Sequence, residues 1–163
     1  MQQYQTILFD LDGTLTDSAP GILNSVRYAC RKLELPLPEE AVLRRFLGPP
    51  LPASFQEYLH LDEAGTRRAV EAFREYYPAK GIFENEVYPG VPALLAALKS
   101  AGRRVVMATS KPEVFARRIM EHFSLEGYFD AICGATIDER RTDKGDVIAY
   151  ALETAGVTDL RHT

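Results

Sequence analysis

Hydrophobic residues along this chain follow two patterns. Short continuous apolar runs occupy residues 7–9, 105–108 and 131–133, and each predicts a buried strand. Elsewhere, apolar residues recur every three or four positions, which is typical of amphipathic helices. This second pattern covers residues 22–33, 42–47, 51–59, 69–77, 91–98, 114–123 and 147–155.

The order of these segments predicts the fold class. No strand-like run lies between about residues 20 and 80, whereas strands alternate with helices after residue 85. Such alternation predicts an α/β fold with a doubly wound parallel sheet, similar to a Rossmann fold. We therefore expect an α/β core formed by residues 1–16 and 85–163. A helical unit, residues 17–84, is expected to be inserted after the first strand.

Two aspartates follow the first apolar run directly. Asp10 falls at the expected carboxyl end of the strand and Asp12 comes two positions later, followed by Gly13 and Thr14. In a parallel sheet, this end of the strands opens into the crevice where ligands bind. One carboxylate there could attack a phosphoryl group, and the other could move a proton. Alternatively, one aspartate caps the turn with its side chain.

Polar residues also follow the second strand and precede the last helix. Thr109 and Ser110 are expected to end the strand, where a hydroxyl and backbone amides can donate to a phosphate oxygen. A simple helix cap is the alternative for this pair. Lys144 could neutralise both a phosphate and the Asp10 carboxylate, or it could be a solvated surface lysine.

Composition narrows the function classes. The chain has 163 residues, of which 46% are hydrophobic, and a net charge of -4, which gives no reason to expect nucleic-acid binding. No apolar run is long enough to span a bilayer, and residues 1–5 do not resemble a signal peptide. The only cysteines, Cys30 and Cys133, lie far apart in apolar surroundings and favour a reduced, cytoplasmic protein. The three histidines are scattered and suggest neither a triad nor a zinc site.

The motifs together resemble the haloacid dehalogenase superfamily of aspartyl phosphatases. Residues 10–15, Asp-Leu-Asp-Gly-Thr-Leu, match the first motif, and residues 105–109 resemble the second. Residues 142–148 resemble the third, with Lys144 as its lysine. Within the superfamily, phosphoglycolate phosphatase-like proteins are the most similar. For these, residues 48–51 correspond to the specificity loop of the helical cap, and residues 88–91 to the return into the core.

This resemblance implies a mechanism and a cofactor. Asp10 would be the nucleophile that forms an aspartyl phosphate, and Asp12 would be the acid/base. The hydroxyl of Thr109, Ser110 beside it and Lys144 would bind the substrate phosphate. An essential Mg²⁺ would be held by the Asp10 carboxylate and the backbone carbonyl of Asp12, with water and phosphate completing its shell.

One expected motif is missing. The fourth motif of the superfamily is a strand that ends in Gly-Asp with another acidic residue a few positions later, and the sequence stops where that strand is expected to begin. We therefore expect the chain to be a truncated phosphatase without its last acidic metal ligand. Since the missing strand usually lies beside the first, the first strand is expected to have an unpaired edge.

The resemblance implies a small phosphorylated metabolite as substrate. The leading hypothesis is Mg²⁺-dependent hydrolysis of a phosphomonoester such as 2-phosphoglycolate. Alternatives are a nucleoside 5'-monophosphate phosphatase, a phosphosugar mutase, or an inactive truncated phosphate-binding fragment. Neither the physiological substrate nor the oligomeric state can be predicted from the sequence.

Overall fold

The computed structural model of the chain describes residues 4–138 and 140–163. Within them the chain forms two compact units. The first, the α/β unit, contains residues 4–17 and Glu86–Thr163, and the second, the helical unit, is Ser18–Asn85. The helical unit is therefore an insertion, because the chain leaves the α/β unit after Asp17 and returns at Glu86.

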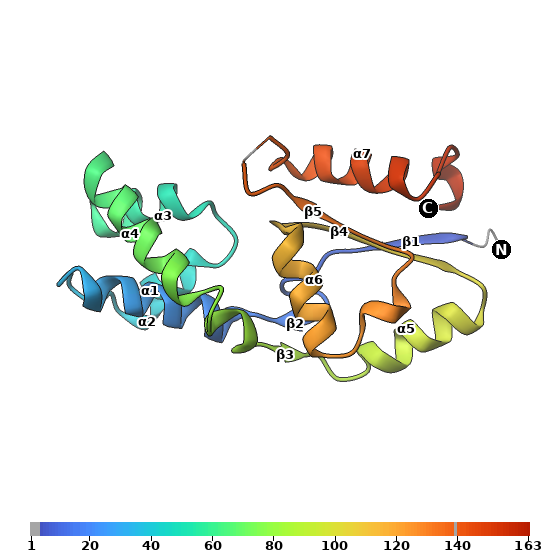
Figure 1. Cartoon of the computed structure of the whole chain (residues 1–163), viewed down its shortest axis with the longest axis horizontal. Coiled ribbons are helices and arrows are strands. Elements are labelled where there is room, and N and C mark those ends of the chain that lie inside the picture. Colours follow the sequence, from blue (N-terminus) through green and yellow to red (C-terminus); the bar gives the residue numbers. More distant parts are fainter. Residues whose placement is uncertain (1–3, 139) are drawn as a thin grey trace. The chain divides into compact units, whose positions relative to one another are not determined.

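A three-stranded parallel sheet forms the centre of the α/β unit (Figure 1). Its strand order is β1 (Thr6–Phe9), β4 (Arg104–Pro112) and β5 (Ala131–Ala135), so β1 is an outer strand. The register pairs Phe9 with Met107, and Met107 in turn with Ile132. All three apolar runs of the sequence thus form strands of one sheet.

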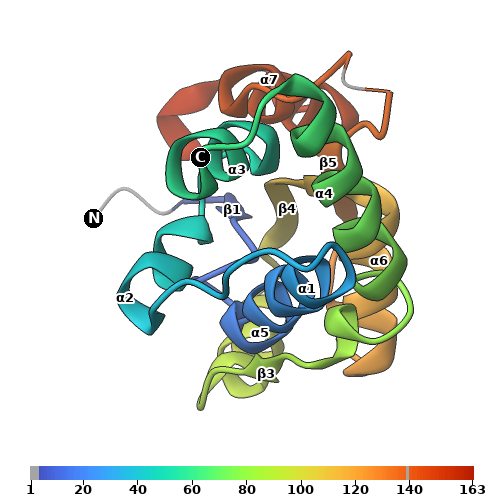
Figure 2. The same ribbon diagram turned by 90° about the vertical axis from the view of Figure 1, so that its left-hand side faces the viewer.

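Helices cover both faces of this sheet. Figures 1 and 2 show α7 (Lys144–Thr154) on one face, and α5 (Val91–Ser100) with α6 (Glu113–His122) on the opposite face. Beneath α7, buried Val147 and Ala151 pack against Val106, Ala108 and Cys133 of the sheet. These three layers confirm the predicted doubly wound parallel α/β fold.

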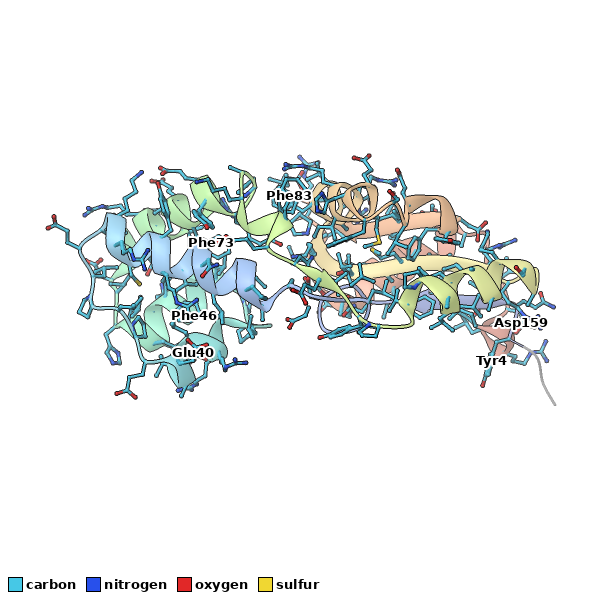
Figure 3. The ribbon with its side chains drawn as sticks, turned by 90° about the horizontal axis from the view of Figure 1, so that it is seen from below. Tyr4, Glu40, Phe46, Phe73, Phe83 and Asp159 are labelled. Atoms are coloured by element: carbon cyan, nitrogen blue, oxygen red, sulfur yellow. The ribbon has the colours of Figure 1, made fainter. Side chains whose placement is uncertain are left out.

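Four helices form the inserted unit: α1 (Ala19–Lys32), α2 (Glu40–Leu43), α3 (Leu51–Leu59) and α4 (Glu63–Tyr76). Residues 20–80 contain no strand, as expected. Phe46 and Phe55 are 2% and 0% exposed, and their ring centroids lie 5.2 Å apart, edge to face. Phe73 is also buried, and Figure 3 shows Phe46 and Phe73 among the helices of this unit.

Several boundaries differ from the sequence prediction. The helix expected to continue to residue 47 ends at Leu43 and is followed by a 3₁₀ turn, Arg44–Phe46. Strand β4 does not end at Thr109 and Ser110 but continues to Pro112, because it resumes pairing with β5 beyond a bulge. Strands β2 (Thr16–Asp17) and β3 (Glu86–Val87) form an antiparallel pair that was not predicted.

The remaining described segments are short. They include the 3₁₀ turns Gly81–Phe83, Glu126–Tyr128 and Leu160–His162. Cys30 and Cys133 are free and buried, and burial raises the pKa of both thiols, which fits inert core residues. Among the described residues, no helix is long and apolar enough to cross a membrane.

Candidate active site

The first motif forms a tight loop after β1. The strand ends at Phe9, and the backbone carbonyl of Leu11 then accepts a hydrogen bond from the N–H of Leu15 at 2.9 Å. Gly13 has a φ of +75°, in the left-handed region that favours glycine. Strand β1 therefore does not continue to Asp12, which forms an isolated β-bridge with Thr16 just before the turn.

Lys144 joins this loop to β4. Its Nζ lies 2.9 Å from Oδ2 of Asp10 and donates a hydrogen bond of 2.8 Å to the backbone carbonyl of Ala108. The other oxygen of Asp10, Oδ1, accepts a hydrogen bond from the N–H of Leu11. The side chains of Asp10 and Lys144 are 40% and 41% exposed, so solvent reaches both. Lys144 is thus partly solvated and also paired with the expected nucleophile, and its contact with phosphate stays a prediction.

The start of α7 fixes the position of Lys144. Asp143 is the N-cap, and its side chain accepts a hydrogen bond of 2.7 Å from the N–H of Gly145. Arg141 anchors the preceding loop: its Nε donates to the carbonyl of Gly134 at 2.9 Å, and its guanidinium stacks 3.6 Å from the centroid of the Tyr150 ring. Arg141 therefore positions the loop that delivers Lys144.

Asp12 has a partner that the sequence did not indicate. Nζ of Lys111 lies 3.0 Å from Oδ2 of Asp12, and the Lys111 side chain is only 6% exposed. Sequence reasoning missed this lysine because it placed the end of the strand two residues earlier. The available signal was a single cation, Lys111, between the apolar run of the strand and Pro112.

Thr109 and Ser110 occupy different environments. Thr109 is 1% exposed, and its hydroxyl oxygen accepts a hydrogen bond of 3.2 Å from the N–H of Lys111. Ser110 is exposed. Neither residue caps α6, whose N-cap is Pro112, so the helix-cap alternative is wrong. Their proposed contact with phosphate stays a prediction.

The oxygen atoms that follow β1 are of the kind that Mg²⁺ prefers. The donors expected for the ion are the carboxylate of Asp10 and the backbone carbonyl of Asp12, and Mg²⁺ is commonly held by one or two carboxylates, several waters and a substrate phosphate. Oδ1 of Asp12 is buried and makes no hydrogen bond, which marks a polar atom without a partner near this site. Over residues 4–138 and 140–163, no three His, Cys, Asp or Glu side chains gather as a metal cluster.

These elements define a class of protein. It is an α/β enzyme with two aspartates after its first strand and a lysine paired with the first of these aspartates. Comparison with protein families gives the same result, since the model of the haloacid dehalogenase-like hydrolases matches residues 7–161. The chain belongs to this family, which confirms the predicted membership. Solved structures of similar sequence share its fold.

Three relatives illustrate the range of named activities. A 5'-nucleotidase from Pseudomonas aeruginosa is 44% identical over 95% of this chain and 70% of its own length. Tyrosine-protein kinase PtkA from Mycobacterium tuberculosis is 43% identical over 91% of this chain and 50% of its own length. The solved structure of PtkA has a TM-score of 0.82 at 41% identity, over 95% of this chain and 71% of that one.

The third relative is a phosphoglycolate phosphatase from Aquifex aeolicus. It is 31% identical over 88% of this chain and 67% of its own length. The present chain thus spans half of PtkA and about two thirds of the two phosphatase relatives. Family and phosphatase-named relatives together support the predicted enzyme class, a phosphoric monoester hydrolase.

Proposed function

We propose that this protein is a Mg²⁺-dependent phosphatase that hydrolyses a small phosphomonoester through an aspartyl phosphate on Asp10. The ion pair between Asp10 and Lys144 is the observation that carries the proposal. It places a fixed positive charge beside a solvent-accessible carboxylate, where an incoming phosphate dianion needs charge compensation. Bound Mg²⁺ would supply further compensation between the Asp10 carboxylate and the phosphate.

The reaction would proceed in two steps. In the first, Asp10 attacks phosphorus and the ester bond breaks, while Asp12 gives a proton to the leaving alcohol. In the second, Asp12 takes a proton from water as the water attacks phosphorus, which releases inorganic phosphate and restores Asp10. Lys144, Thr109 and Ser110 would hold the oxygens of the transferred group.

A nucleoside 5'-monophosphate is the preferred substrate class. The supporting observation is that a relative named 5'-nucleotidase is 44% identical, whereas the phosphoglycolate phosphatase is 31% identical. 2-Phosphoglycolate is the second candidate. The similarity to PtkA suggests an alternative activity, in which a tyrosine hydroxyl accepts the phosphoryl group in place of water.

Phosphate release from both substrates, with Mg²⁺, tests this proposal. The assay uses the natural full-length polypeptide, because this chain spans 70% or less of the three relatives. We expect turnover that stops on chelation with EDTA, and a loss of at least about 10⁴-fold in kcat for Asp10→Asn, since the nucleophile is removed.

Two results would contradict the proposal. Full activity of Asp10→Asn would exclude an aspartyl phosphate on this residue. Transfer of labelled phosphate from a nucleoside triphosphate to a tyrosine peptide, without phosphomonoester hydrolysis, would assign the chain to the kinase-like relatives. Ser110→Ala provides a matched variant at the site rim, for which we expect a smaller loss.

A further inference from the structure

Lys111 is a buried cation in the α/β unit. The residue as a whole is 9% exposed and its side chain 6%, in contrast to the 41% of Lys144. A lysine is rarely buried unless it is paired, because its ammonium loses hydration. Its Nζ lies 3.0 Å from Oδ2 of Asp12, which offsets that loss.

A bulge in β4 directs Lys111 inward. Strands β4 and β5 pair regularly up to Thr109 and Gly134 and then resume at Pro112 and Ala135. Ser110 and Lys111 of β4 therefore have no pairing partners on β5 and form a bulge. A bulge changes the direction in which side chains point. Ser110 points to solvent and Lys111 to the interior.

Gly134 allows β5 to approach the bulge closely. A Cβ at this position would lie 2.6 Å from the carbonyl oxygen of Lys111 and 2.7 Å from the backbone of Glu113. Any larger residue would push the end of β4 away. The backbone around Lys111 is held on its other side by the hydrogen bond from its N–H to Thr109. Contacts within β4 and with β5 thus hold the backbone of Lys111.

Asp12 depends on this cation. Of its two carboxylate oxygens, Oδ2 contacts Lys111, whereas Oδ1 is buried and makes no hydrogen bond. The Lys111 ammonium is therefore the charged group that holds this carboxylate in its observed orientation. We propose that Lys111 is a positioning residue, which keeps Asp12 oriented for proton transfer to the leaving alcohol. The proposal rests on the proposed phosphatase function.

The dependence of the rate on the leaving group tests this inference. An alkyl phosphate needs its leaving oxygen protonated, whereas p-nitrophenolate leaves readily without a proton. We expect Lys111→Met to slow the first turnover of an alkyl phosphate about 10- to 100-fold, part of the contribution of a placed acid. The effect on p-nitrophenyl phosphate and on KM should be much smaller. Lys111→Arg should restore part of the rate.

A double variant and a crystal structure provide independent measurements. If Lys111 acts through Asp12, Lys111→Met combined with Asp12→Asn should be no slower than Asp12→Asn alone. A structure of Lys111→Met without Mg²⁺ should show Asp12 in another rotamer. The matched control is Lys99→Met, which removes a lysine–aspartate pair of 2.7 Å from the same unit, with Asp130; its rates should equal those of the wild type.

Three outcomes would overturn the inference. Equal losses for both leaving groups would indicate a merely structural lysine, and a raised KM with unchanged kcat would make Lys111 a phosphate ligand. Additive losses in the double variant would separate Lys111 from Asp12. If urea unfolding shows that Lys111→Met does not fold, Lys111→Gln carries the same comparison. An inactive wild type would reject the phosphatase function as well, whereas an active wild type with any of these outcomes rejects this inference alone.

Discussion

Lys144 and Lys111 serve the two aspartates in different environments. Lys144 is about as exposed as its partner Asp10, and it also donates to the carbonyl of Ala108. Lys111 is buried against Asp12. An exposed pair of charges contributes little to folding, because water and salt screen it. The ion pair of Lys144 thus contributes little to stability.

Substitution of Lys144 should therefore affect activity more than stability. We expect Lys144→Met to lower kcat/KM by about 10²- to 10³-fold, the typical effect of removing one group that stabilises developing charge. The free energy of unfolding should change by less than about 1 kcal/mol. Steady-state phosphate release and urea unfolding measure the two quantities.

A second lysine of similar exposure serves as the control. Lys32 is 44% exposed and forms an ion pair of 2.5 Å with Glu75 in the helical unit. Lys32→Met should leave kcat/KM within about twofold of the wild type, since exposed ion pairs act locally. Activity of Lys144→Met equal to that of Lys32→Met would show that Lys144 has no part in the reaction.

The resemblance of residues 142–148 to the third motif of the superfamily indicated Lys144 as a partner of Asp10, although 134 positions separate their numbers. It did not indicate Lys111. That residue is directed to Asp12 by a bulge, and bulges depend on pairing between strands distant in sequence. A general expectation that lysines are exposed also argued against it. The chemical roles of Asp10, Asp12, Thr109, Ser110 and Lys144 all stay predictions.

At the level of elements, Asp130 connects the start of the sheet to α5. It precedes β5, and its Oδ2 accepts a hydrogen bond of 2.7 Å from the N–H of Val105 in β4. Its Oδ1 lies 2.7 Å from Nζ of Lys99 on α5. Burial raises the pKa of the Asp130 carboxyl, but the bonds from Lys99 and Val105 together lower it more, so its pKa lies below the ordinary value.

This depressed pKa predicts a pH dependence of stability. Because the folded-state pKa of Asp130 lies below that of the unfolded chain, its stabilising contribution is present above the unfolded pKa of about 4. The contribution is lost as the pH falls through the folded pKa. Asp130→Asn should thus be less stable than the wild type at pH 7, and the difference should shrink below about pH 4.

Urea unfolding at several pH values measures this difference. Glu121→Gln replaces an exposed carboxylate on α6 and should track the wild type throughout the range. Lys99→Met should lower the free energy of unfolding at pH 7 by less than Asp130→Asn does, since it removes only one of the bonds to Asp130. A difference between Asp130→Asn and wild type that stays constant down to pH 3 would contradict the assignment.

The sequence predicted long elements better than short ones. Apolar runs and helical periodicity located β1, β4, β5 and every helix longer than two turns, because each buries a continuous face. Strands β2 and β3 have two residues each, too few for any period to be visible. The pairing of Thr16 with Val87 joins residues on either side of the helical insertion, and no local pattern indicates it.

At the scale of the whole molecule, the insertion has a core of its own. Helices α1, α3 and α4 pack within the helical unit, and the aromatic pair of Phe46 and Phe55 is buried in it. Asp62 caps α4 by accepting a hydrogen bond of 2.7 Å from the N–H of Gly65. The aromatic pair and this cap are local in sequence, whereas the packing of α1 on α4 joins the two ends of the unit.

We therefore predict that residues 18–85 fold when expressed alone. A chain of this size buries a small core, so its stability should be only about 3–5 kcal/mol. Circular dichroism should show helix, and urea should unfold it in one cooperative transition. Phe55→Ala removes a fully buried ring and should cost about 3–5 kcal/mol, enough to abolish that transition.

The matched variant lies on the surface of the same unit. Arg67 is 64% exposed on α4, and Arg67→Ala should change stability by less than about 0.5 kcal/mol. A fragment with helical content but no cooperative transition would show that this core needs the rest of the chain. Equal effects of Phe55→Ala and Arg67→Ala would show that the aromatic core does not hold the unit together, because burial would then have no energetic consequence.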